Sequence, residues 1–112
     1  MITTHVLDTS IGRPAAGIKV SLEALAAGDG WKQIAWGTTD ADGRIRELVG
    51  SGQRLEERRY RLVFDTATYF AGRNVEAFYP VVIVVFEINH PNQHHHIPLL
   101  LSPFGYSTYR GS

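Results

Sequence analysis

The feature that most constrains the fold of this chain is a period-two alternation of apolar and polar residues, interrupted at short intervals by turn residues. Such alternation predicts half-buried β-strands, because successive side chains of a strand point to opposite faces of its sheet. The predicted strands cover residues 2–7, 18–25, 31–39, 44–48, 60–65, 81–88, 94–102 and 105–110. Asp29-Gly30 is typical of a hairpin, and residues 40–43 are predicted to form another turn.

Only one helix is predicted, over residues 67–71. Asp65 or Thr66 can cap its first turn, and Gly72 is expected to end it in the left-handed conformation. Residues 81–88 form a nearly continuous apolar run, which indicates a strand buried on both faces or placed in a subunit contact. Many short strands and one helical turn predict a mainly β fold, an antiparallel β-sandwich of about eight strands with one short helix.

Length and charge restrict the possible functions. The chain has 112 residues, which predicts a single domain over residues 1–112. Its 11 basic and 11 acidic residues cancel, so no net field would attract nucleic acid or an anionic membrane. The absence of cysteine excludes disulfides, a thiol nucleophile and thiolate metal ligands. With neither a secretory signal nor a membrane-spanning run in the sequence, we expect a soluble, cytoplasmic protein without nucleic-acid or membrane partners.

Three consecutive histidines, His94, His95 and His96, open one of the predicted strands. In a strand His94 and His96 share a face about 6.6 Å apart, whereas His95 points to the other face. The pair could line a catalytic or binding surface, since imidazole exchanges protons near neutral pH. It could also bind zinc, if His5 or His90 supplied a third ligand. The pattern alone leaves both interpretations open, together with a structural role for the histidines.

The most specific motif is Tyr-Arg-Gly-Ser at 109–112, preceded by His-x-His-Ile-Pro-Leu-Leu-Leu-Ser-Pro at 94–103. Three further motifs accompany it, Thr-His-Val-Leu-Asp at 4–8, Gly-Arg-Pro-Ala at 12–15 and Thr-Asp-x-Asp-Gly-Arg at 39–44. Together they resemble the pattern of the 5-hydroxyisourate hydrolases, enzymes of urate breakdown that are related to transthyretin. The hormone carrier transthyretin shares the fold of these enzymes but lacks the Tyr-Arg-Gly-Ser ending.

The resemblance implies a transthyretin-like fold and a hydrolase that needs no cofactor and no metal. The implied substrate is 5-hydroxyisourate, and the implied product is 2-oxo-4-hydroxy-4-carboxy-5-ureidoimidazoline, in purine degradation. The catalytic trio would correspond to His5, Arg44 and His96, the last chosen because it directly precedes Ile-Pro in the sequence. The implied assembly is a homotetramer, a dimer of dimers, with active sites in the channel between the dimers.

The resemblance also assigns the end of the chain to the site. Ser112 would belong to the catalytic residues, while Tyr109, Arg110 and Gly111 would bind the substrate. Tyr109 would supply a ring contact or a phenolic hydrogen bond, and Ser112 its hydroxyl or a terminal carboxylate.

Opening the implied substrate requires water to add to a ring carbonyl and a ring nitrogen to leave. The sequence has neither a cysteine nor a Gly-x-Ser-x-Gly motif, so direct attack by water is the simpler mechanism. His5 and His96 would act as general base and proton relay. Arg44 would meet the negative charge that develops on the substrate oxygens.

Three other functions remain as alternatives. A transthyretin-like carrier would bind an aromatic ligand in the tetramer channel, but aliphatic and small hydroxyl residues should line such a channel. A purely structural sandwich module would leave the histidine cluster without a role. A zinc-dependent hydrolase would lose its activity when treated with a chelator.

Overall fold

A computed structural model describes residues 1–50 and 52–112 of the chain. Over these residues the elements are β1 (Ile2–Asp8), β2 (Arg13–Pro14), β3 (Lys19–Leu25), β4 (Trp31–Thr38), β5 (Arg44–Val49), β6 (Arg58–Phe64), α1 (Thr66–Gly72), β7 (Val82–Ile88), β8 (His95–Ser102) and β9 (Gly105–Thr108). Every predicted strand is present, with its bounds shifted by at most two residues. The short strand β2 lies outside the predicted strands, and it forms because it pairs with the end of β1.

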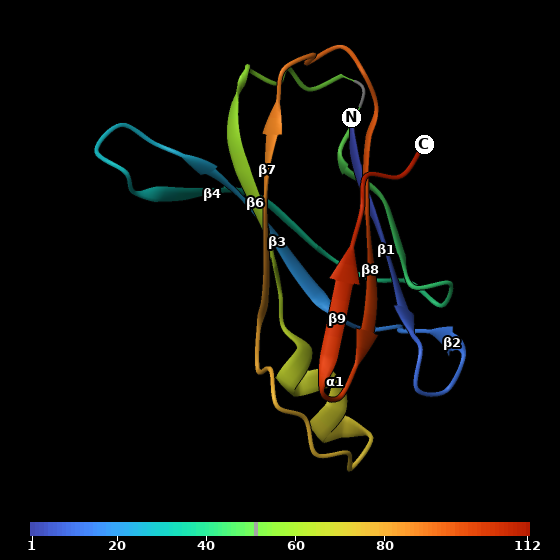
Figure 1. Ribbon diagram of the computed structural model, residues 1–112. Coiled ribbons are helices and arrows are strands. Elements are labelled where there is room, and N and C mark those ends of the chain that lie inside the picture. The colour runs from blue at the N-terminus through green and yellow to red at the C-terminus, as the bar shows by residue number, and fades with distance from the viewer. Residues whose placement is uncertain (51) are drawn as a thin grey trace.

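The strands form two sheets that face each other, as Figure 1 shows. One sheet has the order β2-β1-β8-β9, with β5 also paired to β1, and the other has the order β4-β3-β6-β7. Helix α1 follows β6 at one end of the sandwich (Figure 1). The predicted β-sandwich with one short helix is confirmed.

One pairing departs from the antiparallel expectation, because β1 and β8 run parallel from Ile2 beside His95 to Asp8 beside Leu101. The chain crosses from β7 in one sheet to β8 in the other. The direction of β8 relative to β1 is therefore set by this crossover and not by a local hairpin. Alternation along a segment predicts a strand but carries no information about the direction of its partner.

The helix begins as expected and ends differently. Asp65 is its N-cap, but the prediction that Gly72 ends the helix in the left-handed conformation is wrong, since Gly72 is the last helical residue. The left-handed residue is Asn74, with φ of 57°. The N–H groups of Asn74 and Val75 bond back to carbonyls of the last helical turn, a Schellman pattern in which asparagine takes the place of glycine. Across the described residues, no helix is long and apolar enough to cross a membrane.

The core lies between the two sheets and decides which side chains face outward. Alternate apolar residues of β1 are fully buried in this core, so Thr3 and His5 point to the outer face of their sheet. On β8 the core-facing set begins with His95, which is 6% exposed. His96 therefore points outward on the same face as Thr3 and His5.

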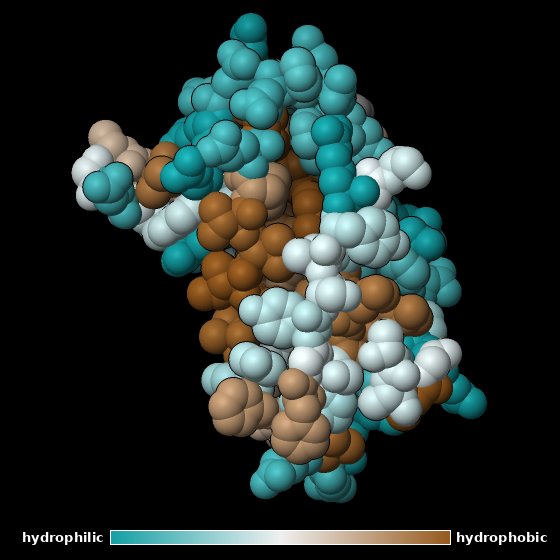
Figure 2. Space-filling view, viewed as in Figure 1, coloured by the Kyte–Doolittle hydropathy of each residue, from teal (hydrophilic) through white to brown (hydrophobic). Residues whose placement is uncertain are grey.

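The apolar run at residues 81–88, which contains β7, is buried on one face only. Val82 and Val84 lie in the core, whereas Val81, Ile83 and Val85 are 41%, 43% and 52% exposed. Figure 2 shows hydrophobic side chains gathered in a band on the β7 side of the molecule. The interpretation that this strand is buried on both faces is wrong for the single chain, while the subunit contact stays a prediction.

Candidate active site

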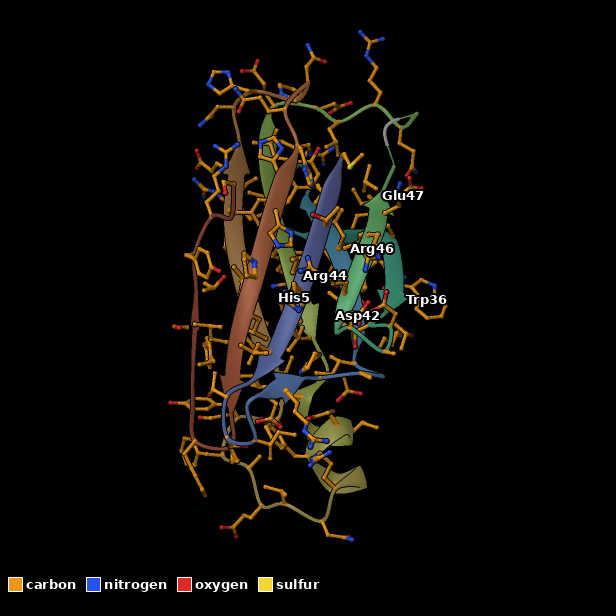
Figure 3. The ribbon with its side chains drawn as sticks, turned by 90° about the vertical axis from the view of Figure 1, so that its right-hand side faces the viewer. His5, Trp36, Asp42, Arg44, Arg46 and Glu47 are labelled. Carbon is orange, nitrogen blue, oxygen red and sulfur yellow. The ribbon has the colours of Figure 1, made fainter. Side chains whose placement is uncertain are left out.

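Strand pairing brings polar side chains from three strands together on the outer face of the first sheet. The β1–β8 register places Thr3 beside His96, although 93 residues separate them in the sequence. The β1–β5 register places His5 beside Arg44. Figure 3 shows His5 and Arg44 on neighbouring strands, with Arg46 further along β5.

The Thr3 hydroxyl lies between two histidines. Its Oγ1 is 2.7 Å from Nε2 of His94 and 2.7 Å from Nδ1 of His96. The two rings lie 6.2 Å apart between their centroids, which confirms the prediction that both occupy one face of the strand. Because a hydroxyl carries a single proton, it donates to one of these nitrogens and accepts an N–H from the other.

An open pocket of about 330 Å³ lies beside this group. Its polar lining comes from both ends of the chain and from β5: Thr3, Thr4, Arg44, Arg46, His94, His96 and Ser112. Three of the four predicted catalytic residues, Arg44, His96 and Ser112, thus share one cavity. His5 is not among the lining residues and stands next to Arg44 on the neighbouring strand.

Burial and nearby positive charge keep the two predicted catalytic histidines neutral. Burial lowers the pKa of His96 below its ordinary value of 6.5, and the Arg44 charge lowers it further. Burial also lowers the pKa of His5, with Arg44 again the second cause. At neutral pH each imidazole therefore has a free lone pair that can accept a proton.

Two arginines of β5 line the pocket, and they differ in their surroundings. Arg46 pairs with Asp40 at 3.7 Å and with Asp42 at 3.2 Å. Within the described residues, no carboxylate forms such an ion pair with Arg44. Asp40 instead accepts the backbone N–H of Arg44 at 3.0 Å, a bond that lowers the pKa of the Asp40 carboxyl. The guanidinium of Arg44 thus keeps its charge for a ligand.

The end of the chain passes directly over His96. The Gly111 N–H donates to the His96 carbonyl at 2.8 Å. A Cβ at position 111 would lie 2.5 Å from Cδ2 of His96 and 3.3 Å from Cγ of Pro98. Only glycine allows the backbone to come this close to the imidazole ring. Gly111 thereby places Ser112 at the pocket.

Tyr109 and Arg110, both predicted to bind substrate, line a second hollow of about 250 Å³ between β7 and the end of β9. His96 lines this hollow as well as the first pocket. The Arg110 guanidinium donates to the side-chain carbonyl of Gln93 at 3.1 Å, and Tyr109 is 57% exposed. Of the four terminal residues, Tyr109 and Arg110 therefore line one hollow and Ser112 lines the other, while His96 lines both.

Sequence reasoning missed Thr3, whose hydroxyl makes the most direct contact with the predicted base. The available signal was its position two residues before His5, which places both side chains on one face of a strand. Zinc binding by the His94–His96 pair would have required a third ligand. In the part of the chain that the structure describes, no three His, Cys, Asp or Glu side chains are grouped to hold a metal ion.

A two-sheet sandwich with this strand order, carrying a histidine and arginine pocket on its outer sheet face, is a transthyretin-like protein. The sequence model of the HIUase/Transthyretin family matches residues 2–111, and the chain belongs to this family.

Individual relatives include 5-hydroxyisourate hydrolases and a transthyretin. The 5-hydroxyisourate hydrolase of Mus musculus is 46% identical over 112 residues, covering 99% of this chain and 94% of that protein. The solved 5-hydroxyisourate hydrolase of Klebsiella pneumoniae is 38% identical with a TM-score of 0.84, covering 99% of this chain and 98% of its own. Sea bream transthyretin in complex with thyroxine is 37% identical with a TM-score of 0.90, covering 98% and 93% of the two chains.

Proposed function

We propose that this protein is a hydrolase that converts 5-hydroxyisourate into 2-oxo-4-hydroxy-4-carboxy-5-ureidoimidazoline in urate degradation. The observation that carries the proposal is a single pocket lined by the neutral imidazole of His96 and by the guanidinium of Arg44, which has no ion-pair partner among the described residues. A base and a fixed positive charge are the two groups that hydrolysis of a cyclic amide requires. The relatives named 5-hydroxyisourate hydrolase support the choice of substrate.

The first chemical step is attack by water on a ring carbonyl. Nδ1 of His96 is bonded to Thr3, which leaves Nε2 as the nitrogen that takes a proton from water. The oxygen of water bonds to the carbonyl carbon, and the carbonyl oxygen becomes an oxyanion beside Arg44. The ring C–N bond then breaks, and the proton passes from His96 to the leaving nitrogen. His5, the neighbour of Arg44, is the second candidate for base or relay.

The end of the chain completes the site in this proposal. Gly111 holds the backbone against His96, and Ser112 offers a polar group to the substrate in the same pocket. Tyr109 and Arg110 would contact the part of the substrate that extends toward the second hollow.

The direct test is the ultraviolet decay of freshly generated 5-hydroxyisourate, with protein and with buffer alone. The substrate is expected to decay unaided, so the rate should rise in proportion to protein concentration. A parallel sample treated with a chelator should retain this acceleration. Acceleration abolished by the chelator would favour a zinc hydrolase, and no acceleration would refute the enzyme proposal.

The pH dependence of kcat/KM, which reports the pKa of the free enzyme, should show an acid limb below pH 6.5. The catalytic imidazole works in its neutral form, and its folded-state pKa is lowered from 6.5 by burial and Arg44. Activity is therefore retained at pH 6.5 and lost as the pH falls through the lowered value. The folded state binds fewer protons there than the unfolded state, so stability falls in the same direction. Thermal unfolding at each pH separates the two effects, and an acid limb above pH 6.5 would contradict the assignment.

Replacing Gly111 with alanine should reduce kcat by about 10–100-fold, because misplacement of a catalytic group by about 1 Å has effects of this size. The new methyl group would stand 2.5 Å from the His96 ring, so either the ring or the end of the chain must move. Gly105→Ala is the matched control, since its Cβ would meet only the Ser102 hydroxyl at 3.8 Å. Equal activity of the two variants in the decay assay would contradict the role of Gly111.

We further propose that the protein acts as a homotetramer, a dimer of dimers, in the cytoplasm. The support is the row of exposed apolar side chains on β7 and directly before it, namely Val81, Ile83 and Val85, since exposed apolar patches mark interaction surfaces. Light scattering combined with the activity assay tests this assembly. A monomer that retains full activity would contradict the placement of the sites at a subunit contact.

The second candidate function is a carrier for an aromatic ligand. The likeness to sea bream transthyretin in complex with thyroxine favours it. The pocket lined by Arg44, His94 and His96 argues against it, because sites for apolar ligands are mostly apolar. Calorimetric titration with thyroxine would favour the carrier if it showed tight binding without hydrolysis of 5-hydroxyisourate.

A further inference from the structure

The Thr3 hydroxyl and the His94 imidazole are not needed for the water attack described above, yet they are connected to its base. Thr3 is 7% exposed, and its Oγ1 is within 2.7 Å of a ring nitrogen on each histidine. Nδ1 of His96, Oγ1 of Thr3 and Nε2 of His94 therefore form a continuous hydrogen-bonded chain. It leads from His96 to His94, which lines the same pocket and is more exposed to solvent.

We propose that Thr3 is a positioning residue that holds His96 in the Nδ1–H tautomer and links it to His94 as a proton relay. This inference rests on the proposed hydrolase function. In the resting state the His96 Nδ1–H donates to Thr3, and the Thr3 hydroxyl donates to Nε2 of His94. Nε2 of His96 is then left with the lone pair that faces the attacking water.

The relay transfers protons along the chain without changing the total number of protons. Nε2 of His96 takes a proton from water, Nδ1 of His96 passes its proton to Oγ1 of Thr3, and the hydroxyl proton passes to Nε2 of His94. His96 ends neutral with its proton on Nε2, and His94 carries the positive charge. The reverse transfers return the proton to the leaving nitrogen of the substrate.

The two histidines at the ends of this chain differ in their exposure to solvent. The charged and titratable groups around the network include His5 of β1, Arg44 and Arg46 of β5, Arg54 beside His94, Arg110 beside His96 and the amino group of Met1. Among them, Arg44 and His5 disfavour a positive charge on His96. His94 is exposed to water, and a hydrated cation costs less than a half-buried one.

The test is Thr3→Val, which removes the hydroxyl and keeps the branched shape. We expect kcat to fall by about 10–100-fold with KM nearly unchanged, because the variant misorients the base but leaves the contacts with the substrate intact. Long-range proton–nitrogen NMR of the histidine rings should show one dominant His96 tautomer in the wild type and a mixture in the variant. Thr3→Ser should restore both kcat and the single tautomer, a rescue that a purely structural role does not predict.

Two further variants keep the test decisive. Thr66→Val removes a buried hydroxyl that bonds the Tyr79 carbonyl far from the pocket, so it should lower stability and leave kcat and the tautomer unchanged. His94→Phe changes an exposed residue and should lower kcat by about tenfold, with no additional loss when it is combined with Thr3→Val.

Wild-type kcat and a single His96 tautomer in Thr3→Val, or wild-type kcat in His94→Phe, would overturn the relay. If Thr3→Val changes the His96 tautomer but the wild-type protein does not hydrolyse 5-hydroxyisourate, the proposed function is refuted and the positioning role of Thr3 stands.

Discussion

Replacing His96 with asparagine is expected to lower kcat for 5-hydroxyisourate by about 10²–10⁴-fold, the usual contribution of a general base. Asparagine keeps a polar group near the position of Nδ1 but cannot take a proton from water. It also lets Gly111 keep its present backbone path, because the smaller asparagine side chain does not clash with it. The measurement is the stopped-flow ultraviolet decay of freshly generated substrate under single-turnover conditions.

The matched control for this variant is His90→Asn, the same chemical change at an exposed histidine in the loop before β8. This variant should retain wild-type kcat. Circular dichroism must show the same β-sheet spectrum for both variants. Activity of His96→Asn within about threefold of the wild type would remove His96 from the role of base and transfer that role to His5.

Replacing Arg44 with methionine is expected to lower kcat by about 10²–10³-fold, the range seen when one donor to a developing oxyanion is removed. Methionine keeps much of the apolar stem while removing the charge and the fork of donors. A second effect should accompany the loss. The Arg44 charge lowers the pKa of His96 and of His5, so its removal should move the acid limb of the pH profile to higher pH.

Arg46→Met is the control that distinguishes the loss of any positive charge from the pocket from the loss of the particular charge beside the oxyanion. Arg46 also lines the pocket, but Asp40 and Asp42 offset its charge. The exposed position of this ion pair predicts a small effect on stability. We expect a much smaller loss of kcat than for Arg44→Met and no upward shift of the acid limb. Equal losses in the two variants would contradict the specific role of Arg44.

Much of the fold could be predicted from local patterns. Period-two alternation placed the principal strands within two residues of their observed bounds, because alternation reflects which side chains face a core. The same pattern correctly separated His95 from His94 and His96. Local patterns failed where a distant contact decides the outcome. β2 exists only because β1 pairs with it. The local prediction for the end of α1 failed for a different reason: the left-handed residue is Asn74, because glycine is favoured at such a position but not required.

The candidate site could be predicted in part. The motifs selected Arg44, His96 and Ser112, which the structure brings into one pocket. They placed Tyr109 and Arg110 with them, whereas these two residues line the adjoining hollow. The motifs gave no indication of Thr3, since a threonine two residues before a histidine is an ordinary strand residue. Its significance depends on the parallel register that sets it opposite His96.

The sequence by itself therefore determined the strands, the faces of their side chains and the residue types available for proton transfer. These properties depend on neighbours a few positions away, through the two-residue repeat of the strand. Only the tertiary structure decided that β8 lies parallel to β1, that Thr3 bridges His94 and His96, and that Gly111 covers the ring of His96. The physical reason is that these contacts join the two ends of the chain. Burial of a shared core sets that pairing, and no local pattern encodes it.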